Sequence, residues 1–412
     1  SYNHTVIPFN LDRKGPLMAY KPRKKIEQVE EQSTSSENPT NRQIIEGVIE
    51  KINKTFKSNI ISFADEYDAG FLLRRPTGII SLDIAIQGGF PRGIIEIAGE
   101  NNVGKTQLSV EVCKQLQKNY GEDACIALCM VEPWDKSFWK NLGFKVSFSE
   151  EEITSGEKAL KRKYTAEEKA YLKEQVGQVV HAKCLNAEDM LSTALKLIET
   201  GIFQLVVIDS VGSMMSEQQD DKEFGEKTYG GNSTAIQEFV NRFTQLKTNT
   251  TVIMINQVRD NMKAGNSPYA EEHRVLGGNA LKHGKFVSIW LTKGAKIKET
   301  INGVENVEIG RTNNWLIKKQ KCGGADGERG HYDFYKGRHG YPLGIDIIGN
   351  LLSTAVLYDI VEKSGAWYSY KGERLGQGID KAAIMLKEHP EIVEEIKARC
   401  FDKAGIAFLM RE

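Results

Sequence analysis

One short segment has the residue types and the spacing of a phosphate-binding loop. It runs Gly99-Glu100-Asn101-Asn102-Val103-Gly104-Lys105-Thr106. Glycines let the backbone curl so that its N–H groups face phosphate oxygens. In such loops the lysine reaches the β- and γ-phosphates, and the threonine hydroxyl binds Mg²⁺. A glycine-rich turn that matches by chance is the alternative interpretation.

The segments on either side of this loop are those that the motif requires. Residues 94–98 form an apolar run typical of a strand, and residues from 105 onward have the pattern of a helix. The helix N-terminus would add partial positive charge beside the phosphates. We therefore expect residues 99–107, Gln107 included, to bind a nucleotide such as ATP together with Mg²⁺.

Three further polar residues follow apolar runs that resemble strands. Asp209 ends one of them, and a carboxylate beside the loop would hold the Mg²⁺ shell. Glu132 ends another, where a carboxylate can orient the attacking water, although an ordinary turn acid is the alternative. Gln257 follows a third run, and its amide can sense the γ-phosphate.

Two long polar segments, 214–232 and 258–276, follow the strands that carry Asp209 and Gln257. Long irregular segments that start from a core strand are usually functional or disordered. Both leave the same edge of the sheet, so both can face one ligand. A cluster of Lys318, Lys319 and Lys321 is either a basic surface edge or a contact to a neighbour's nucleotide, as arginine fingers make.

From about residue 66, short β-rich runs alternate with helical stretches. This pattern predicts an α/β fold with a mostly parallel sheet covered by helices on both faces. Mixed charge over 149–178 indicates a solvated surface insertion. The expected strands are 94–98, 124–131, 203–208, 251–255, 286–291 and 314–318, and the expected helices are 105–120, 187–200 and 234–247.

The ends of the chain differ from this core. Residues 1–40 offer little to bury and are expected to be a flexible arm, with a short basic cluster at 21–25. Residues 41–57 have an apolar helical stripe that can pack on its own core or on another subunit. The expected divisions are an arm at 1–40, a helix and linker at 41–65, a core at 66–335, and a small α+β domain at 336–412.

Composition limits the class of protein. The 412 residues carry a formal net charge of +0, so no global field attracts nucleic acid or membrane, and DNA binding needs local basic patches. No apolar run is long enough to span a bilayer, and residues 1–25 lack the apolar segment of a secretory signal. Six scattered cysteines have no zinc spacing, and Cys125 and Cys129 are expected to be buried free thiols. A reducing, cytoplasmic setting is therefore expected.

Together these motifs resemble those of the RecA-type homologous recombinases, over roughly residues 41–400. The most specific part is 362–378 (EKSGAWYSYKGERLGQG), which resembles the C-terminal domain of bacterial members. The other motifs that carry the resemblance are 80–85 (ISLDIA), the phosphate loop, 208–210 (IDS), 256–259 (NQVR) and 277–282 (GGNALK). The resemblance implies a RecA-like P-loop ATPase core with an N-terminal segment that docks on the adjacent protomer.

The resemblance also implies an activity and its partners. It predicts a DNA-dependent ATPase that forms a helical filament on single-stranded DNA and exchanges strands with double-stranded DNA in recombination, repair and the SOS response. A self-cleaving repressor and ssDNA-binding or mediator proteins are further partners that it implies. The ATP would lie between adjacent protomers, so that hydrolysis requires assembly.

Family roles fall on individual positions of this chain. Lys105, Thr106 and Asp209 match the phosphate and Mg²⁺ residues, Glu132 the catalytic carboxylate, and Gln257 the γ-phosphate sensor. Asp135 and Phe138 match the adenine contacts, and Lys319 and Lys321 the lysines that reach ATP across the interface. Segments 214–232 and 258–276 match the two DNA-binding loops. The DNA-contacting residues expected in and after the second loop are Arg259, Met262, Lys263, Arg274, Gly277, Gly278 and Asn279.

The chain also departs from the family pattern. The spacing from Glu132 to the Leu142-Gly143 pair is one residue short, the arm and the insertion are additional, and the sequence ends at Arg411-Glu412 without an acidic tail. Such a tail restrains DNA access in the family, so looser control is expected. These differences fit a divergent bacterial or phage-encoded member. The alternatives are a hexameric helicase on the same core, and a filament that acts chiefly as a co-protease-type regulator.

Overall fold

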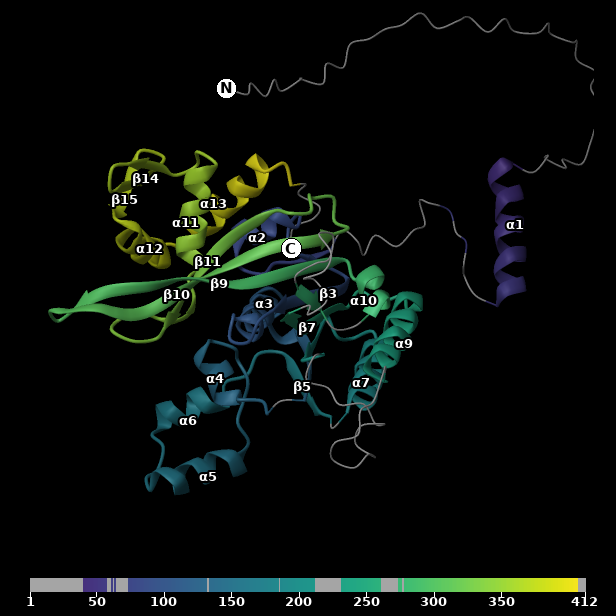
Figure 1. The fold of residues 1–412 in the computed structure, drawn as a ribbon, viewed down its shortest axis with the longest axis horizontal. Helices are drawn as coiled ribbons and strands as arrows, with labels where there is room; N and C mark the ends of the chain where they lie inside the picture. The colour runs from purple at the N-terminus through teal and green to yellow at the C-terminus, as the bar shows by residue number, and fades with distance from the viewer. Residues whose placement is uncertain are drawn as a thin grey trace, which may run out of the picture. The chain divides into compact units, whose positions relative to one another are not determined.

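The computed structural model describes residues 40–57, 61, 63, 73–131, 133–184, 186–211, 231–260, 273–275 and 278–406 (Figure 1). The chain divides into two compact units, residues 1–67 and residues 68–412. The arm expected at 1–40 lies outside the described residues apart from Thr40. No helix in the described ranges has the length and apolar character needed to cross a membrane.

The first unit contains helix α1, Asn41–Phe56. Thr40 caps its N-terminus: the Thr40 hydroxyl accepts from the Gln43 N–H, and the Gln43 side chain accepts from the Thr40 N–H. The helix ends where Lys57 adopts a left-handed conformation. The expected helix is confirmed. None of its residues is buried, and its apolar stripe is exposed at Ile44, Ile45, Val48 and Phe56.

The second unit is built on a ten-stranded sheet in the order β12-β11-β10-β9-β3-β7-β6-β4-β5, with β8 paired to β7. Strands β5, β4, β6, β7, β3 and β9 run parallel, and from β9 to β12 each strand is antiparallel to its neighbour. The predicted, mostly parallel α/β sheet is therefore confirmed. The strands are β3 (Gly93–Gly99), β4 (Cys125–Met130), β5 (Gln178–Lys183), β6 (Leu205–Asp209), β7 (Thr251–Asp260), β8 (His273–Val275), β9 (Val287–Ile301), β10 (Val304–Gln320), β11 (Arg329–Lys336) and β12 (Leu343–Ile345).

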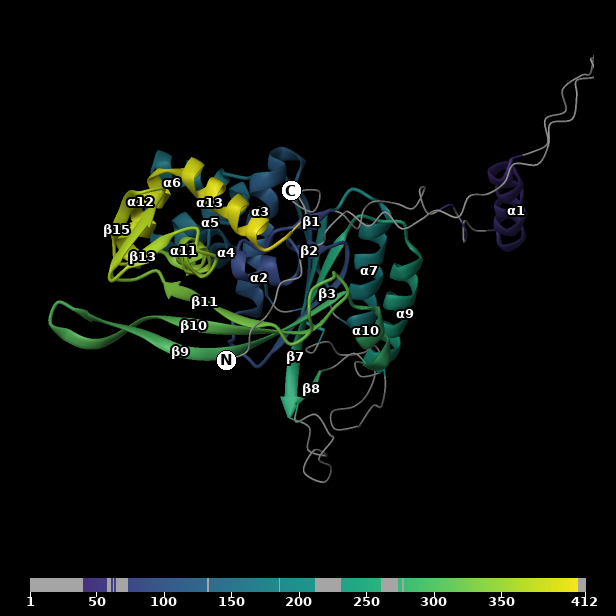
Figure 2. The same ribbon diagram turned by 90° about the horizontal axis from the view of Figure 1, so that it is seen from above.

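Alternation along the strands places side chains on two faces of this sheet. Ile95 and Ile97 of β3 pack into one hydrophobic core with the helix α3 (Lys105–Tyr120). Ile94 packs into a second core with the helices α7 (Ala187–Glu199), α9 (Gly231–Gln245) and α10 (Gly278–Gly284). Figure 2 shows α7, α9 and α10 together on one side of the central strands. Helices thus cover both faces, as the apolar strand pattern predicts.

The hairpin of β9 and β10 is far longer than the sequence pattern predicted. The expected strands 286–291 and 314–318 are only its buried ends, and pairing extends outward to Ile301 opposite Val304. Figure 1 shows the hairpin projecting from the body of the second unit. Its outer half is largely exposed and polar, with lysines and glutamates, so that part of it has no apolar run to reveal it. The prediction of two short strands was wrong for this reason.

The charged insertion forms two helices, α5 (Glu150–Leu160) and α6 (Ala166–Lys173), each with a capping box. Most of its residues are exposed, as expected, but it is tied to α4 (Lys136–Asn141). Lys136 Nζ donates to Glu152 Oε2 at 2.7 Å, and Lys140 Nζ donates to the Glu174 carbonyl at 2.9 Å. The insertion is therefore anchored on the helix that follows β4.

The C-terminal part packs three helices on a three-stranded antiparallel sheet with a core of its own. Leu352, Tyr368, Leu386 and Phe401 belong to that core, and Ile80 of α2 (Ile80–Ala85) joins it. Its elements are α11 (Ile347–Leu357), β13 (Glu362–Ser364), β14 (Trp367–Tyr370), β15 (Glu373–Gln377), α12 (Ile379–Glu388) and α13 (Pro390–Lys403). The remaining short elements are β1 (Arg74–Arg75), β2 (Phe90–Pro91) and the 3-10 turn η3 (Gly121–Asp123).

Asp83 of α2 is fully buried beside this junction. Its Oδ1 accepts from the Thr77 N–H at 2.7 Å, whereas its Oδ2 has no hydrogen-bond partner. Burial raises the pKa of Asp83 to about 6. Relative to the unfolded chain, the folded protein therefore favours the protonated Asp83 carboxyl. The stability that this protonation contributes is lost as the pH rises through about 6.

Replacing Asp83 with asparagine should remove this pH dependence. Between pH 4 and pH 7 the free energy of unfolding of the Asp83→Asn variant should rise relative to that of the wild type, by up to roughly 3 kcal/mol. Urea unfolding of both proteins across this pH range measures the difference. Parallel stability curves would show that the Asp83 carboxyl titrates as an ordinary aspartate.

Candidate nucleotide site

The phosphate loop connects β3 to α3, and two of its glycines are required by its shape. Gly104 has a φ of +91° and precedes α3 as its N-cap, and a Cβ there would lie 2.9 Å from Asn313 Nδ2. A Cβ on Gly99 would lie 2.6 Å from the Leu291 carbonyl oxygen. The loop backbone thus packs directly on the neighbouring strands, which only glycine allows.

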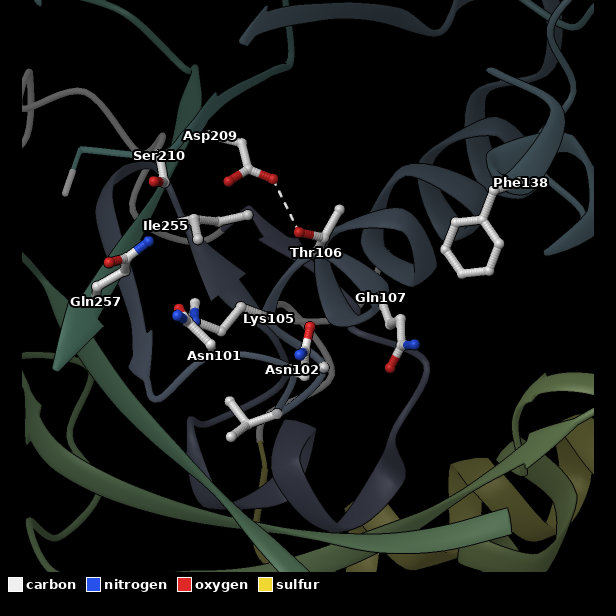
Figure 3. A pocket seen from close by; sticks show the side chains of 12 residues that line it. Asn101, Asn102, Lys105, Thr106, Gln107, Phe138, Asp209, Ser210, Ile255 and Gln257 are labelled. Atoms are coloured by element: carbon white, nitrogen blue, oxygen red, sulfur yellow. Dashed lines mark hydrogen bonds between the residues drawn. The ribbon is translucent and has the colours of Figure 1, made fainter. Parts of the chain in front are cut away.

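The charged and polar side chains of the loop converge at the start of α3. Lys105 Nζ donates to the carbonyl oxygens of Gly99, at 3.0 Å, and of Glu100, at 2.6 Å. Thr106 Oγ1 donates to Asp209 Oδ2 at 2.8 Å, so the end of β6 meets the first turn of α3 (Figure 3). A cis peptide bond joins Asp209 to Ser210. The hydroxyl and carboxylate predicted to share an Mg²⁺ ion are therefore adjacent.

A polar cavity opens at this point and brings most of the predicted nucleotide residues together. Figure 3 shows Lys105, Thr106 and Gln107 at the start of α3, Asp209 and Gln257 on the strands beside them, and Phe138 on the same side of the view as Gln107. Gly99 and Glu100 were also expected in the site but do not line the cavity, and their carbonyl oxygens instead bind Lys105 Nζ. The residues that line the cavity are Asn101, Asn102, Val103, Gly104, Lys105, Thr106, Gln107, Phe138, Asp209, Ser210, Ile255 and Gln257.

The donor set fits a triphosphate with a magnesium ion. Mg²⁺ usually takes one or two protein oxygens and completes its shell with water and phosphate oxygens. Thr106 and Asp209 offer a hydroxyl and a carboxylate, and the α3 N-terminus and Lys105 offer positive charge to phosphates. Within the described ranges, no three His, Cys, Asp or Glu side chains form a cage that could hold a metal alone.

The two residues expected to contact adenine, Asp135 and Phe138, lie at the start of the helix α4. Asp135 caps this helix, since its Oδ1 accepts from the Phe138 N–H at 2.9 Å, while Phe138 lines the cavity. Trp134 stacks on His181 of β5 with ring centroids 4.9 Å apart. Burial, together with the charges of Lys136 and Lys183, holds the pKa of His181 below its usual value. Glu132, the expected catalytic carboxylate, lies outside the described residues.

Comparison with known proteins identifies the family. A model of the RecA N-terminal domain matches residues 43–166 and 152–322, and a model of the RecA C-terminal domain matches residues 349–405. The chain is 30% identical to protein RecA of Geobacter sulfurreducens over 367 residues, which cover 88% of this chain and 95% of the relative. This chain belongs to the RecA family.

Two other RecA proteins show similar coverage. The RecA protein of Campylobacter lari is 28% identical over 374 residues, with 89% of this chain and 94% of the relative covered. That of Geobacter metallireducens is 30% identical over 335 residues, with 80% and 85% covered. The resemblance inferred from the motifs is therefore confirmed, and the identity of about 30% marks a divergent member.

Lys319 and Lys321, the RecA-family candidates for contact across the interface, do not line the cavity. Both lie near the end of the β10 segment and reach the C-terminal end of α10. Lys319 Nζ donates to the Lys282 carbonyl at 2.5 Å, and Lys321 Nζ donates to the His283 carbonyl at 2.8 Å. Burial and the neighbouring lysine charges lower the pKa of Lys319. Each ammonium group therefore also stabilises a helix C-terminus.

The structure describes no side chain of the seven residues expected to contact DNA in a RecA protein. Met262, Lys263 and Gly277 lie wholly outside the described part, as do residues 214–230 of the segment matched to the first DNA-binding loop. The backbone of β7 continues past Gln257 and pairs with β8, with Arg259 opposite Arg274. Gly278 and Asn279 begin the helix α10, and the side chains of these two residues and of the two arginines are not described.

Four residues around the RecA-type loop were missed by the sequence analysis. Ser210 and Ile255 line the cavity, and Asn313 and Tyr332 lie against Gly104 from the strands β10 and β11. Ser210 adjoins Asp209, so its position next to a predicted site residue was the one available signal. Asn313 and Tyr332 meet the loop only through the pairing of β10 with β11, which no local pattern reveals.

Proposed function

We propose that this RecA-family chain is a DNA-dependent ATPase that polymerises on single-stranded DNA and exchanges strands with homologous double-stranded DNA. The observation that carries the proposal is the position of Gln257. It lines the nucleotide cavity and lies on the same strand, β7, that continues into the segment matched to a DNA-binding loop. One strand thus links the site expected to bind ATP to the site expected to bind DNA.

Each group in the cavity has a role in this proposal. Lys105 and the N–H groups at the start of α3 neutralise the β- and γ-phosphates. Thr106 and Asp209 hold Mg²⁺, which when bound stabilises negative charge on the transferring phosphoryl group. Glu132 positions the attacking water, Asp135 and Phe138 contact the adenine, and Gln257 contacts the γ-phosphate.

Assembly completes the site. We propose that Lys319 and Lys321 reach the nucleotide of the adjacent protomer, as trans-acting cations do in other ATPases. The exposed apolar stripe of α1 supports the protomer-docking role that its family resemblance implies, because an amphipathic helix needs a partner for such a face. Hydrolysis then depends on polymerisation, and the ATP-bound form holds DNA more tightly than the ADP-bound form.

DNA recognition in this proposal is carried by phosphate contacts. Contacts to the DNA phosphates come from Arg259, Lys263 and Arg274, while Met262 separates neighbouring bases. The chain approaches the DNA closely at Gly277, Gly278 and Asn279. Homology is read by base pairing rather than by side chains. Binding is therefore expected to weaken strongly with salt although the formal net charge is +0.

All six cysteines are free thiols, which supports a reducing, cytoplasmic setting.

ATP turnover with and without single-stranded DNA tests the proposal. We expect low turnover of the protein alone and a clear stimulation by DNA that is lost at high salt. Turnover that is equal with and without DNA would contradict it. A protein that binds ATP and DNA without turnover would instead be a scaffold, such as a regulator of a self-cleaving repressor.

A further inference from the structure

Four buried polar side chains form a cluster on the α9–α10 face of the sheet, outside the nucleotide cavity. Glu96 of β3 is 1% exposed, and Asn256 and Ser288 are fully buried. Lys285 Nζ and Ser288 Oγ both bind Glu96 Oε2, the latter at 2.6 Å. Asn256 Nδ2 donates to Glu96 Oε1 at 3.1 Å. One carboxylate therefore receives hydrogen bonds from β7, from β9 and from the residue that follows α10.

The amide of Asn256 is held at both of its ends. Its Nδ2 donates to Glu96, and its Oδ1 accepts from the Gln257 N–H at 2.9 Å. The orientation of Asn256 and the backbone position of Gln257 are therefore both coupled to Glu96. Glu96 lies on β3 three residues before Gly99, the first residue of the phosphate loop.

The second connection of Glu96 is to the helix α10. Lys285 directly follows this helix, and its N–H donates to the Leu281 carbonyl at 3.2 Å, which continues the helical pattern. Gly284 packs so closely on α9 that a Cβ would lie 2.2 Å from Val240 Cγ1. The end of α10 is therefore fixed by close packing and by the Lys285–Glu96 ion pair.

These two connections lie on elements that flank the segment 258–276 in the sequence. β7, which carries Gln257, precedes most of the segment, and α10 follows it. The end of β7 and the helix α10 are thus tied to the same buried carboxylate, β7 through Asn256 and α10 through Lys285. A buried ion pair adds little stability over apolar residues of similar size, so stability alone does not explain it.

We propose that Glu96 and Lys285 are positioning residues that hold two elements on the strand of the phosphate loop: the end of β7 beyond Gln257, and the helix α10. Through this arrangement a change at the phosphates changes the positions of the end of β7 and of α10 together. The proposal rests on the proposed function, because it assigns to these residues the coupling between ATP and DNA. Neither residue touches the nucleotide cavity, so neither is a catalytic residue.

The test is the double variant Glu96→Gln/Lys285→Met, which removes both charges and keeps similar volumes. We expect it to melt near the wild-type temperature, because no buried charge is left without its partner. We expect its ATP turnover without DNA to be retained and its stimulation by single-stranded DNA to fall about tenfold, the scale of a typical coupling between sites. The preference of DNA binding for a slowly hydrolysed ATP analogue over ADP should fall in parallel.

Arg75→Met is the matched control. Arg75 is also a buried cation that binds β7, through Thr251 Oγ1 at 3.0 Å, but at the end of the strand remote from Gln257. The Arg75→Met substitution should lower the melting temperature and leave the stimulation of ATP turnover by DNA unchanged in the folded protein. Ser288→Ala, which removes one hydrogen bond to Glu96, should fold and lose at least about half of the stimulation.

The outcomes separate this inference from the proposed function. A folded double variant, or a folded Ser288→Ala variant, with full DNA stimulation would overturn the positioning role. An equal loss of stimulation in Arg75→Met would also overturn it, because destabilisation alone would then explain the effect. A wild-type protein without any DNA-stimulated turnover would contradict the proposed function itself.

Discussion

Replacing Lys105 with alanine is expected to lower ATP turnover at least about 100-fold while the fold persists. Among the described residues that line the cavity, Lys105 is the only one with a positively charged side chain. It lies at the N-terminus of α3, where the helix dipole adds to its attraction for phosphates. No other side chain described there can replace the charge that it offers to the γ-phosphate.

Steady-state turnover with saturating single-stranded DNA measures this loss, and thermal melting checks the fold. Lys118→Ala is the matched control, since Lys118 lies in the last turn of the same helix and its side chain is largely exposed. Lys118→Ala should retain wild-type turnover. Turnover by Lys105→Ala at the wild-type rate would remove the phosphate loop from the mechanism.

Replacing Gln257 with alanine should separate nucleotide binding from the response to DNA. The Gln257 side chain lines the cavity at the point where β7 leaves it, while the phosphate and Mg²⁺ groups lie on other elements. The Gln257→Ala variant should therefore bind ATP with an affinity near that of the wild type. Its stimulation by single-stranded DNA should fall about tenfold or more.

The measurement is the ratio of turnover with DNA to turnover without it, together with nucleotide binding at equilibrium. Gln178→Ala, at the exposed start of the edge strand β5, is the control and should keep the full ratio. Normal acceleration of Gln257→Ala by DNA would show that coupling takes another route.

Local sequence signals were sufficient for much of the site. Residues 105–120 were predicted to be a helix and form α3 with the same bounds, because a glycine precedes the helix and another follows it. Asp209 and Gln257 were recognised because each ends or follows a buried apolar run. In parallel sheets such positions meet at one edge, so their convergence on the loop follows from the strand pattern.

Features that depend on contacts between distant segments were not predicted. Glu96 lies within an apolar run, and its partners Asn256 and Lys285 are 160 and 189 residues further along the chain. Only the order of the strands brings them together. The edge strand β5 was missed because its side chains are half-buried or exposed, so it has no apolar run.

Lys319 and Lys321 show a similar limit. Their charge and their position near a strand end pointed to phosphate contact, whereas the structure shows their ammonium groups on the carbonyls at the end of α10. A basic cluster in a sequence does not reveal which oxygen atoms the fold places beside it. In the proposed mechanism the same two lysines contact both the nucleotide of a neighbouring protomer and the helix α10, which follows the segment 258–276.

Electron microscopy of the protein with single-stranded DNA and a slowly hydrolysed ATP analogue tests the central claim most directly. The claim is that a nucleotide between adjacent protomers controls how tightly they hold DNA. It predicts regular helical filaments that form with the analogue and dissociate when ADP replaces it. Particles that remain single protomers, or that close into rings, with DNA and analogue in excess would contradict it.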